Sequence, residues 1–378
     1  MFSYSKFIER FRRITYSGRY MPEIDGLRFI AIFLVAVVMH LGNLLREEQL
    51  HISYNDKNIF HVMIMGGGYG VSLFFIISGF ILALPFAEEK LLNGKTVKLK
   101  DYYLRRVTRI EPPYIVSMIL FLLMRVYILH YGSLKELLPN FFASIFYVHN
   151  IVYHSASAIN GVAWSLEVEI QFYILAPLLT NIFFIKNVKL RRSLLLLGIL
   201  IGAVFSYTWQ YHYTTILDKG CYFFSGIFLA DCYLLRKKDN DGMKVALMMI
   251  FVFGCWLFIP AYYVSLYFCV IKLFITLLLF YVAITNDKLK KFLSIEIIAI
   301  IGGMCYSIYL VHMGVYGLMR HHFFSIQFSN IAVVSLLIQL CISVFIVLIV
   351  SGVFFLLIEK PTMEKDWYKK IFTRRVTL

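Results

Sequence analysis

The sequence predicts an all-α, polytopic membrane protein, and three observations point to that class. Of the 378 residues, 60% are hydrophobic and only 16% are charged, whereas a soluble domain carries about 25% charged residues. Ten apolar stretches are long enough to span a bilayer. Lys and Arg gather in every second connection between these stretches, as positive-inside sorting requires. We therefore expect a bundle of about ten transmembrane helices with both termini in the cytoplasm.

The predicted spans follow one another through the chain with short connections. They lie near residues 26–45, 69–87, 111–131, 164–185, 193–211, 216–235, 243–260, 262–285, 296–317 and 331–358. Residues 1–20 are predicted to be a basic cytoplasmic tail, and residues 21–378 a single transmembrane domain with no separate soluble domain. The first apolar run continues as a full span, so we expect no secretory signal peptide.

The net charge of +15 reflects this topology, so we expect membrane lipid and no nucleic acid as a partner. The six Cys show no metal or disulfide spacing and are interpreted as small buried hydrophobes. We expect no metal.

Two ionisable residues, Arg28 and His40, lie on the first predicted span. An ionisable side chain inside hydrocarbon costs several kcal/mol unless it is compensated, so both are functional candidates. They are twelve positions apart, roughly 18 Å along a helix. Alternatively, Arg28 is an interfacial anchor that extends to the headgroups, and His40 is a core histidine bonded to a backbone carbonyl.

A cationic cluster, Arg105, Arg106 and Arg109, precedes the third predicted span. Arg105 and Arg109 are four residues apart and are expected to share a helix face. Forked guanidiniums suit the phosphates of a nucleotide-like ligand; lipid headgroup contact is the alternative. Pro112 and Pro113 are expected in the first turn of a new helix.

Further polar residues occur at three of the remaining spans. Ser78 lies in a stretch of small residues on the second span, where close helix packing is the alternative to a role in lining a cavity. Glu167 and Glu169 start the fourth span, two residues apart, so only one is expected to face the bundle interior. Tyr309 and His312 share a face of the ninth span, and His312 is either functional or a satisfied structural histidine.

These residues fall within six motifs that occur in order along the chain. They are Ile24-Asp-Gly-Leu-Arg28 with His40; Gly70-Val-x-Leu-Phe-Phe-x-Ile-Ser-Gly-Phe80; Arg105-Arg-x-x-Arg-Ile-x-Pro112; Trp164-Ser-Leu-x-Val-Glu-x-Gln-Phe-Tyr173; Tyr306-Ser-x-Tyr-Leu-x-His312; and Glu359-Lys-Pro361. Through them the chain resembles the acyltransferase-3 family of integral membrane acyltransferases. The resemblance covers essentially the whole chain.

The resemblance implies a membrane O-acyltransferase that moves an acyl group, usually acetyl, from cytoplasmic acyl-coenzyme A to a hydroxyl of a lipid-linked or surface glycan, as in lipopolysaccharide O-antigen. It implies a bacterial cytoplasmic (inner) membrane. Arg28, Arg105, Arg106 and Arg109 would contact the acetyl-CoA donor. His40 would be the base that activates the acceptor, and Glu169 its acidic partner. Ser78, Trp164, Ser165, Tyr309 and His312 are candidates for the substrate cavity.

The chain departs from the family in the spacing between Arg28 and His40. The family typically has ten residues between them, and this chain has eleven. At about 100° per residue, the added residue would turn the two side chains about 120° apart on a regular helix. We therefore predict a π-bulge or similar distortion between them.

The alternative function is a transporter or permease for a small polar or anionic solute, because a polar cavity among many spans also describes that class. No inverted repeat is evident in the sequence, which argues against this alternative.

Overall fold

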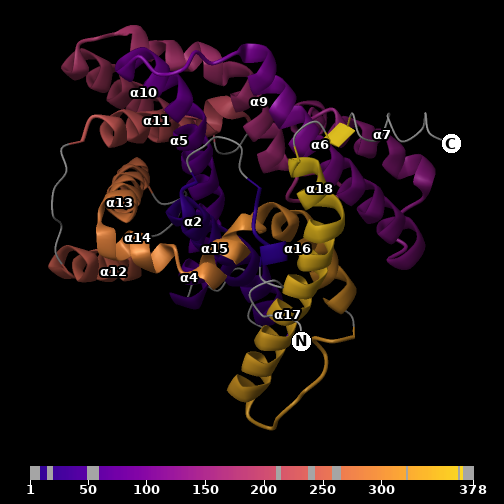
Figure 1. Ribbon diagram of the computed structural model, residues 1–378. Coiled ribbons are helices and arrows are strands. Elements are labelled where there is room, and N and C mark those ends of the chain that lie inside the picture. The colour runs from indigo at the N-terminus through magenta and orange to yellow at the C-terminus, as the bar shows by residue number, and fades with distance from the viewer. Residues whose placement is uncertain are drawn as a thin grey trace.

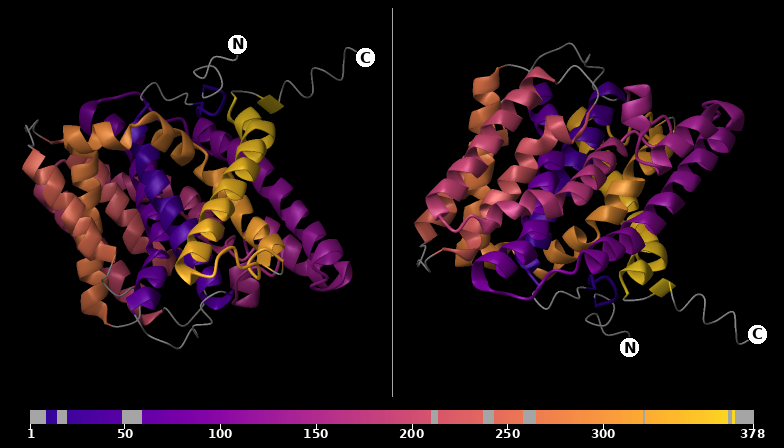
Figure 2. Two further views of the ribbon diagram at one scale, coloured as in Figure 1. Left: turned by 90° about the horizontal axis from the view of Figure 1, so that it is seen from below. Right: turned by 90° about the horizontal axis from the view of Figure 1, so that it is seen from above.

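The structure is a computed structural model that describes residues 9–14, 20–48, 59–209, 214–236, 243–257, 265–320, 322–364 and 367–368. Every regular element in these ranges is a helix, so the predicted all-α class is confirmed for them. The helices α2 and α5 run through the middle of the molecule, with α12 and α13 on one side and α6 and α7 on the other (Figures 1 and 2).

The elements follow the order of the predicted spans, with several long helices divided by local changes of helix type. They are α2 (Pro22–Ile32), η1 (Phe33–Leu41), α3 (Gly42–Glu48), α4 (Ile59–Gly66), α5 (Tyr69–Leu92), α6 (Leu99–Leu123), η2 (Met124–Ile128), α7 (Leu134–Ile145), α8 (His149–Tyr153), α9 (Trp164–Leu179), η3 (Thr180–Phe184), α10 (Val188–Thr208), α11 (Ile216–Leu234), α12 (Met243–Leu257), α13 (Leu266–Thr285), α14 (Asp287–Leu293), α15 (Glu296–Gly303), α16 (Cys305–Arg320), α17 (Ala332–Phe354), η4 (Phe355–Glu359) and α18 (Lys360–Met363).

Six helical stretches of the described residues are long and apolar enough to cross a membrane. A seventh is counted if α15 and α16, which are bent by 68° at their junction, form one span. The predicted number of ten is therefore not confirmed. The predicted fifth, sixth and seventh spans coincide with α10, α11 and α12. The six stretches are Pro22–Glu48, His61–Leu92, Leu99–Ile128, Trp164–Phe184, Leu266–Thr285 and Val333–Met363.

The predicted distortion between Arg28 and His40 is confirmed, because η1 is a π-helix from Phe33 to Leu41. A π-helical turn leaves backbone carbonyls without their usual partners. The hydroxyl of Tyr316 donates to the Ala36 carbonyl oxygen at 3.1 Å. The wider turn thus receives a hydrogen bond from another helix, which stabilises it.

Glycines let the central helices approach closely. A Cβ atom at Gly226 would lie 2.4 Å from the Ile76 carbonyl oxygen, and one at Gly79 would lie 2.5 Å from the Phe223 carbonyl oxygen. The crossing of α5 and α11 therefore depends on the absence of side chains at these two positions.

Two sequence predictions about local structure are wrong. Pro112 and Pro113 lie inside α6, which begins at Leu99, thirteen residues before Pro112. Membrane helices tolerate interior prolines because neighbouring groups satisfy the freed backbone. Glu167 and Glu169 both point into the protein: Glu167 is fully buried and accepts hydrogen bonds from Asn150, while Glu169 bonds to Ser78 on α5. The first turns of α9 are packed on both sides, since residues 165–168 are all buried, so neither carboxylate has a free face there.

Five parts of the chain meet at one end of the bundle, which we call the basic end: residues 9–14, the start of α2, and the helices α14, α15 and α18. The Lys360 ammonium group of α18 donates to the Arg10 carbonyl oxygen at 2.5 Å, and Arg12 forms an ion pair with Glu296 of α15 at 3.1 Å. A Cβ atom at Gly26 of α2 would lie 2.3 Å from the Leu293 carbonyl oxygen. The described ends of the chain and the start of α2 therefore lie together.

Candidate functional site

His40 and His312 form a direct hydrogen bond although 272 residues separate them in the chain. His40 Nδ1 lies 2.9 Å from His312 Nε2. His312 Nδ1 in turn lies 3.0 Å from the Ile308 carbonyl oxygen and 2.9 Å from the Tyr309 carbonyl oxygen. The pair joins η1 to α16.

The backbone determines where the protons of this pair sit. A carbonyl oxygen only accepts, so His312 Nδ1 must carry its proton and donate it. In neutral His312, Nε2 is then an acceptor, and His40 Nδ1 must donate to it. The remaining nitrogen of His40, Nε2, is therefore left unprotonated, with a lone pair that can accept a proton.

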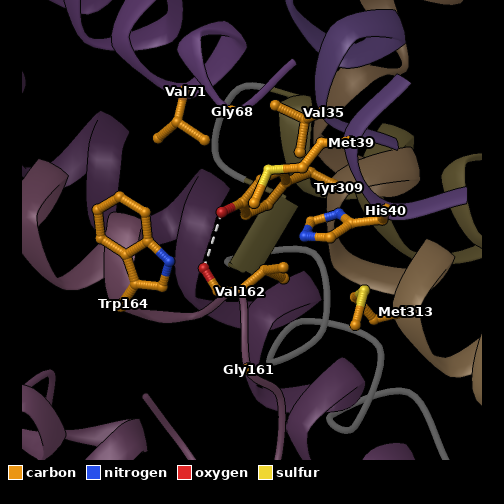
Figure 3. Close-up of a pocket in the computed structure, with 10 residues that line it drawn as sticks. All are labelled: Val35, Met39, His40, Gly68, Val71, Gly161, Val162, Trp164, Tyr309 and Met313. Carbon is orange, nitrogen blue, oxygen red and sulfur yellow. Dashed lines mark hydrogen bonds between the residues drawn. The ribbon is translucent and has the colours of Figure 1, made fainter. Parts of the chain in front are cut away.

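His40 lines a cavity of about 210 Å³. Figure 3 shows the imidazole of His40 directed into this space, with Trp164 on the opposite side. Most of the wall is apolar, which excludes competing polar partners for the imidazole. The lining residues are Val35, Met39, His40, Gly68, Val71, Gly161, Val162, Trp164, Tyr309 and Met313.

Two of the polar groups at the cavity wall differ in whether they are already paired. The Tyr309 hydroxyl donates to the Val162 carbonyl oxygen at 2.7 Å and lies 2.6 Å from the Ser165 hydroxyl. The indole N–H of Trp164 has no hydrogen-bond partner among the described residues, and its nitrogen faces the space between the rings in Figure 3. The cavity thus offers one free N–H donor, from Trp164, and one free lone pair, from His40.

The predicted cavity residues are only partly brought together. Trp164 and Tyr309 line the cavity, whereas Ser165 and His312 lie behind it, where they bond to Tyr309 and His40. Ser78 does not line the cavity and donates instead to Glu169.

Glu169 is not the partner of His40, and this prediction is wrong. Its carboxylate accepts hydrogen bonds from Ser78 and Tyr173 and lies within electrostatic range of Arg28 and Arg106. Glu169 is five residues along α9 from Trp164, roughly 7.5 Å along the axis towards the arginines. His312 takes the position that Glu169 was expected to fill.

Four arginines form what we call the arginine cluster: Arg13, Arg28, Arg106 and Arg109. Arg28 Nη1 donates to Asp25 Oδ1 at 2.5 Å, and Arg13 Nη1 lies 3.2 Å from the same oxygen. Arg109 lies within electrostatic range of Arg28 and of Glu359. The structure therefore brings three of the four predicted cationic residues together.

Arg106 completes the arginine cluster from the same face of α6 as Arg109. Its guanidinium lies 4.1 Å from the centre of the Tyr102 ring and 5.9 Å from that of Tyr173. The π-face of an aromatic ring attracts a cation, so the two tyrosines hold the group in place.

Arg105 lies outside the arginine cluster, contrary to the prediction. Its side chain is exposed, and its Nε donates to the Asp101 carbonyl oxygen of its own helix at 2.9 Å. The inward face of α6 follows Tyr102, Arg106 and Arg109, at i, i+4 and i+7. Spacing alone could not distinguish this face from the one that contains Arg105.

Sequence reasoning missed two members of this region. Asp25 is almost fully buried, and its position three residues before Arg28 is the usual spacing of a helical ion pair, a signal that was available. Arg13 lies in the N-terminal segment, where no periodicity indicates which side chain turns inward.

The cavity and the arginine cluster are separate regions connected by the first helix. His40 bonds to His312 of α16, and Arg28 lies within electrostatic range of Cys305 of α16 and Tyr173 of α9. The π-helix η1 begins after Arg28 and contains His40. No arginine lines the cavity. Among the described residues, no three His, Cys, Asp or Glu side chains come together as metal ligands.

Comparisons with known proteins give one family and several relatives. A family model described as an acyltransferase domain matches residues 21–361. A peptidoglycan O-acetyltransferase, OatA, of Listeria monocytogenes is 30% identical over 203 residues, which are 50% of this chain and 28% of that protein. The O-acetyltransferase OatA of Staphylococcus aureus is 27% identical over 342 residues, 79% of this chain and 51% of that protein.

These curated relatives are longer than this chain, which spans about half of the Staphylococcus aureus protein and less of the Listeria protein. No solved structure matches.

Proposed function

Because this chain belongs to the acyltransferase-3 family, we propose that it is a membrane O-acyltransferase, which moves an acyl group, most simply acetyl, from cytoplasmic acyl-coenzyme A to a glycan hydroxyl. The names of its relatives support acetyl as the group transferred. One of them is named a peptidoglycan O-acetyltransferase, so peptidoglycan or its lipid-linked precursor is the acceptor to test first. The lipopolysaccharide acceptor suggested by the resemblance has no such support.

The single observation that carries this proposal is the hydrogen-bonded chain from the Ile308 and Tyr309 carbonyl oxygens through His312 to His40. It leaves His40 Nε2 as a proton acceptor inside an apolar cavity. Such a group is the general base that an alcohol nucleophile requires, because the pKa of an alcohol is far above 7.

The reaction follows from this placement. The acceptor hydroxyl donates its proton to His40 Nε2 while its oxygen attacks the carbonyl carbon of the thioester. The tetrahedral intermediate then collapses and breaks the C–S bond. The imidazolium returns its proton to the leaving thiolate, which departs as the free thiol. His312 Nε2 accepts the hydrogen bond from His40 Nδ1–H throughout and so keeps the ring oriented, as the third group of a catalytic triad does.

Trp164 supplies a second element of this mechanism. The tetrahedral intermediate carries a negative oxygen that needs a preorganised donor. The free indole N–H of Trp164 faces the same space as His40 (Figure 3). We assign it to that oxygen.

The arginine cluster is the proposed site for the phosphates of the donor. Guanidiniums bind phosphate with two parallel hydrogen bonds, and positive-inside sorting places the basic end in the cytoplasm, where acyl-coenzyme A is made. The flexible arm of coenzyme A would bridge the roughly 18 Å between Arg28 and His40. The nucleotide and the thioester would then occupy the two separate regions of the protein.

The test is acyl transfer by the purified full chain in proteoliposomes. Coenzyme A carrying a labelled acetyl group is added on the side of the basic end, together with a lipid-linked peptidoglycan precursor. We expect labelled acetyl ester on the glycan and one free thiol released per ester. Uptake of a small solute with no ester formed would contradict the proposal and favour the permease.

Trp164→Phe is expected to slow transfer by about 10²-fold, since it removes one oxyanion donor but keeps an aromatic ring. Binding of coenzyme A and the thermal unfolding midpoint should remain near those of the wild type. Rates are measured by release of free thiol under saturating donor. An unchanged rate would remove Trp164 from the mechanism and leave the role of His40 intact.

A further inference from the structure

The N-terminal segment 9–14 lies across the basic end and is held there by two other parts of the chain. Lys360 Nζ donates to the Arg10 carbonyl oxygen at 2.5 Å, and its contact with the Glu9 carbonyl oxygen is 3.4 Å. The Arg12–Glu296 ion pair holds the same segment against α15. The position of this segment is therefore determined by α18 and α15.

The adjacent residues Arg12 and Arg13 point in different directions. The side chain of Arg12 is 52% exposed, whereas that of Arg13 is 14% exposed and reaches Asp25. Arg13 lies within electrostatic range of Arg28 and Arg109. The segment thus places one guanidinium near those of Arg28 on α2 and Arg109 on α6.

The hydrogen bonds of Arg13 are incomplete. Its Nε is buried without a partner, and its Nη1 shares Asp25 Oδ1 with Arg28, at 3.2 Å against 2.5 Å for Arg28. The longer of the two contacts is the one that is more easily given up. Arg13 can therefore turn part of its guanidinium to another anion while Arg28 keeps Asp25.

The charges around Arg13 favour such an anion. The four arginines of the arginine cluster have three carboxylates within electrostatic range, Asp25, Glu169 and Glu359. Glu359 already accepts hydrogen bonds from Ser307, and Glu169 accepts them from Ser78 and Tyr173. Burial lowers the pKa of Arg13 to about 9, with further lowering by the positive charges of Arg109 and Arg28. A bound anion would supply the missing negative charge.

We propose that Arg13 is a phosphate-binding residue of the donor site, carried into that site by the N-terminal segment 9–14. The inference rests on the proposed function, and it adds to that site a residue outside the six motifs. A phosphate group of the coenzyme A nucleotide would accept from the Arg13 guanidinium beside Arg28 and Arg109. The anion would thus be held between segment 9–14, α2 and α6.

The experiment compares coenzyme A binding to the full chain in nanodiscs by isothermal titration calorimetry. Arg13→Gln should weaken binding by about 10-fold or more, since a hydrogen bond to a charged group contributes about 1.5–3 kcal/mol. Arg10→Gln is the matched control, because it removes an exposed positive charge from the same segment and keeps the backbone carbonyl oxygen that Lys360 binds. It should bind coenzyme A as the wild type does.

The outcomes separate this inference from the proposed function. If wild-type protein does not bind coenzyme A, the proposed function itself fails. If wild type and Arg10→Gln bind and Arg13→Gln binds equally well, only the role of Arg13 is overturned.

A second measurement covers the case in which Arg13→Gln does not fold. Phenylglyoxal modification of Arg13 in the wild type, followed by peptide mass spectrometry, should be slowed by coenzyme A. Modification of Arg12 should not change. Equal modification of Arg13 with and without coenzyme A would overturn the inference.

Discussion

Replacing His40 with Gln is expected to lower the rate of acyl transfer by about 10²- to 10⁴-fold, the usual contribution of a general base. Gln has a similar polar end but cannot take up a proton. His40 lines the cavity and contacts His312, whereas the arginine cluster lies elsewhere. Coenzyme A binding should therefore be retained, and the loss should appear in the rate at saturating donor. The measurement is thiol release in proteoliposomes, with binding measured separately by calorimetry.

The control for this experiment is His322→Gln, because His322 is exposed and lies outside the cavity. It should transfer at the wild-type rate. Transfer by His40→Gln at a rate close to that of wild type would exclude His40 as the base.

The variant His312→Phe tests whether the hydrogen bond from His40 to His312 orients the His40 ring. Without the His312 Nε2 acceptor, the Nδ1 proton of His40 is no longer held, and the ring can adopt the other tautomer. The rate should fall by less than for His40→Gln, because the base itself remains. The pH–rate profile should also change, which a purely structural role of His312 would not produce.

Replacing Gly302 with Ala is the second substitution with a large expected effect. A Cβ atom at Gly302 would lie 1.7 Å from the Asp25 carbonyl oxygen and 2.9 Å from the Phe29 backbone nitrogen. Neither backbone atom can move away alone, so α15 and α2 must separate. Overpacking of this kind costs about 1–3 kcal/mol. Because Asp25 holds Arg28 and Arg13, coenzyme A binding should weaken as well.

Gly303→Ala is a control at the next position of the same helix. The nearest atom to a Cβ there is Arg13 Cβ at 3.5 Å, an ordinary contact. Both Gly-to-Ala changes raise helix propensity by about the same amount. A difference in stability between the two variants therefore reports the contact of residue 302 with α2. The thermal unfolding midpoint should fall for Gly302→Ala and stay near wild type for Gly303→Ala. Equal midpoints and equal coenzyme A binding would show that the close contact carries no such cost.

The spacing of Arg28 and His40 shows how far sequence reasoning could reach at the site. One added residue between them was enough to predict a helix distortion, and η1 is a π-helix at that place. The reason is geometric: the side chains of Arg28 and His40 both turn inward only if a wider, π-helical turn accommodates the extra residue. No comparable rule existed for Arg105, since either side of α6 could have faced the bundle.

What the sequence determined by itself is the class of the protein. Long apolar stretches in a bilayer must satisfy their own backbone, and helices do so within one segment, so composition and hydropathy were sufficient for an all-helical membrane domain. The tertiary structure alone decided which polar side chains meet. His40 pairs with His312 rather than Glu169, and Arg13 joins Arg28 at Asp25. Such pairs depend on how each helix is rotated and how deep it lies against its neighbours. Close glycine contacts, such as that of Gly302 of α15 with α2, determine this placement.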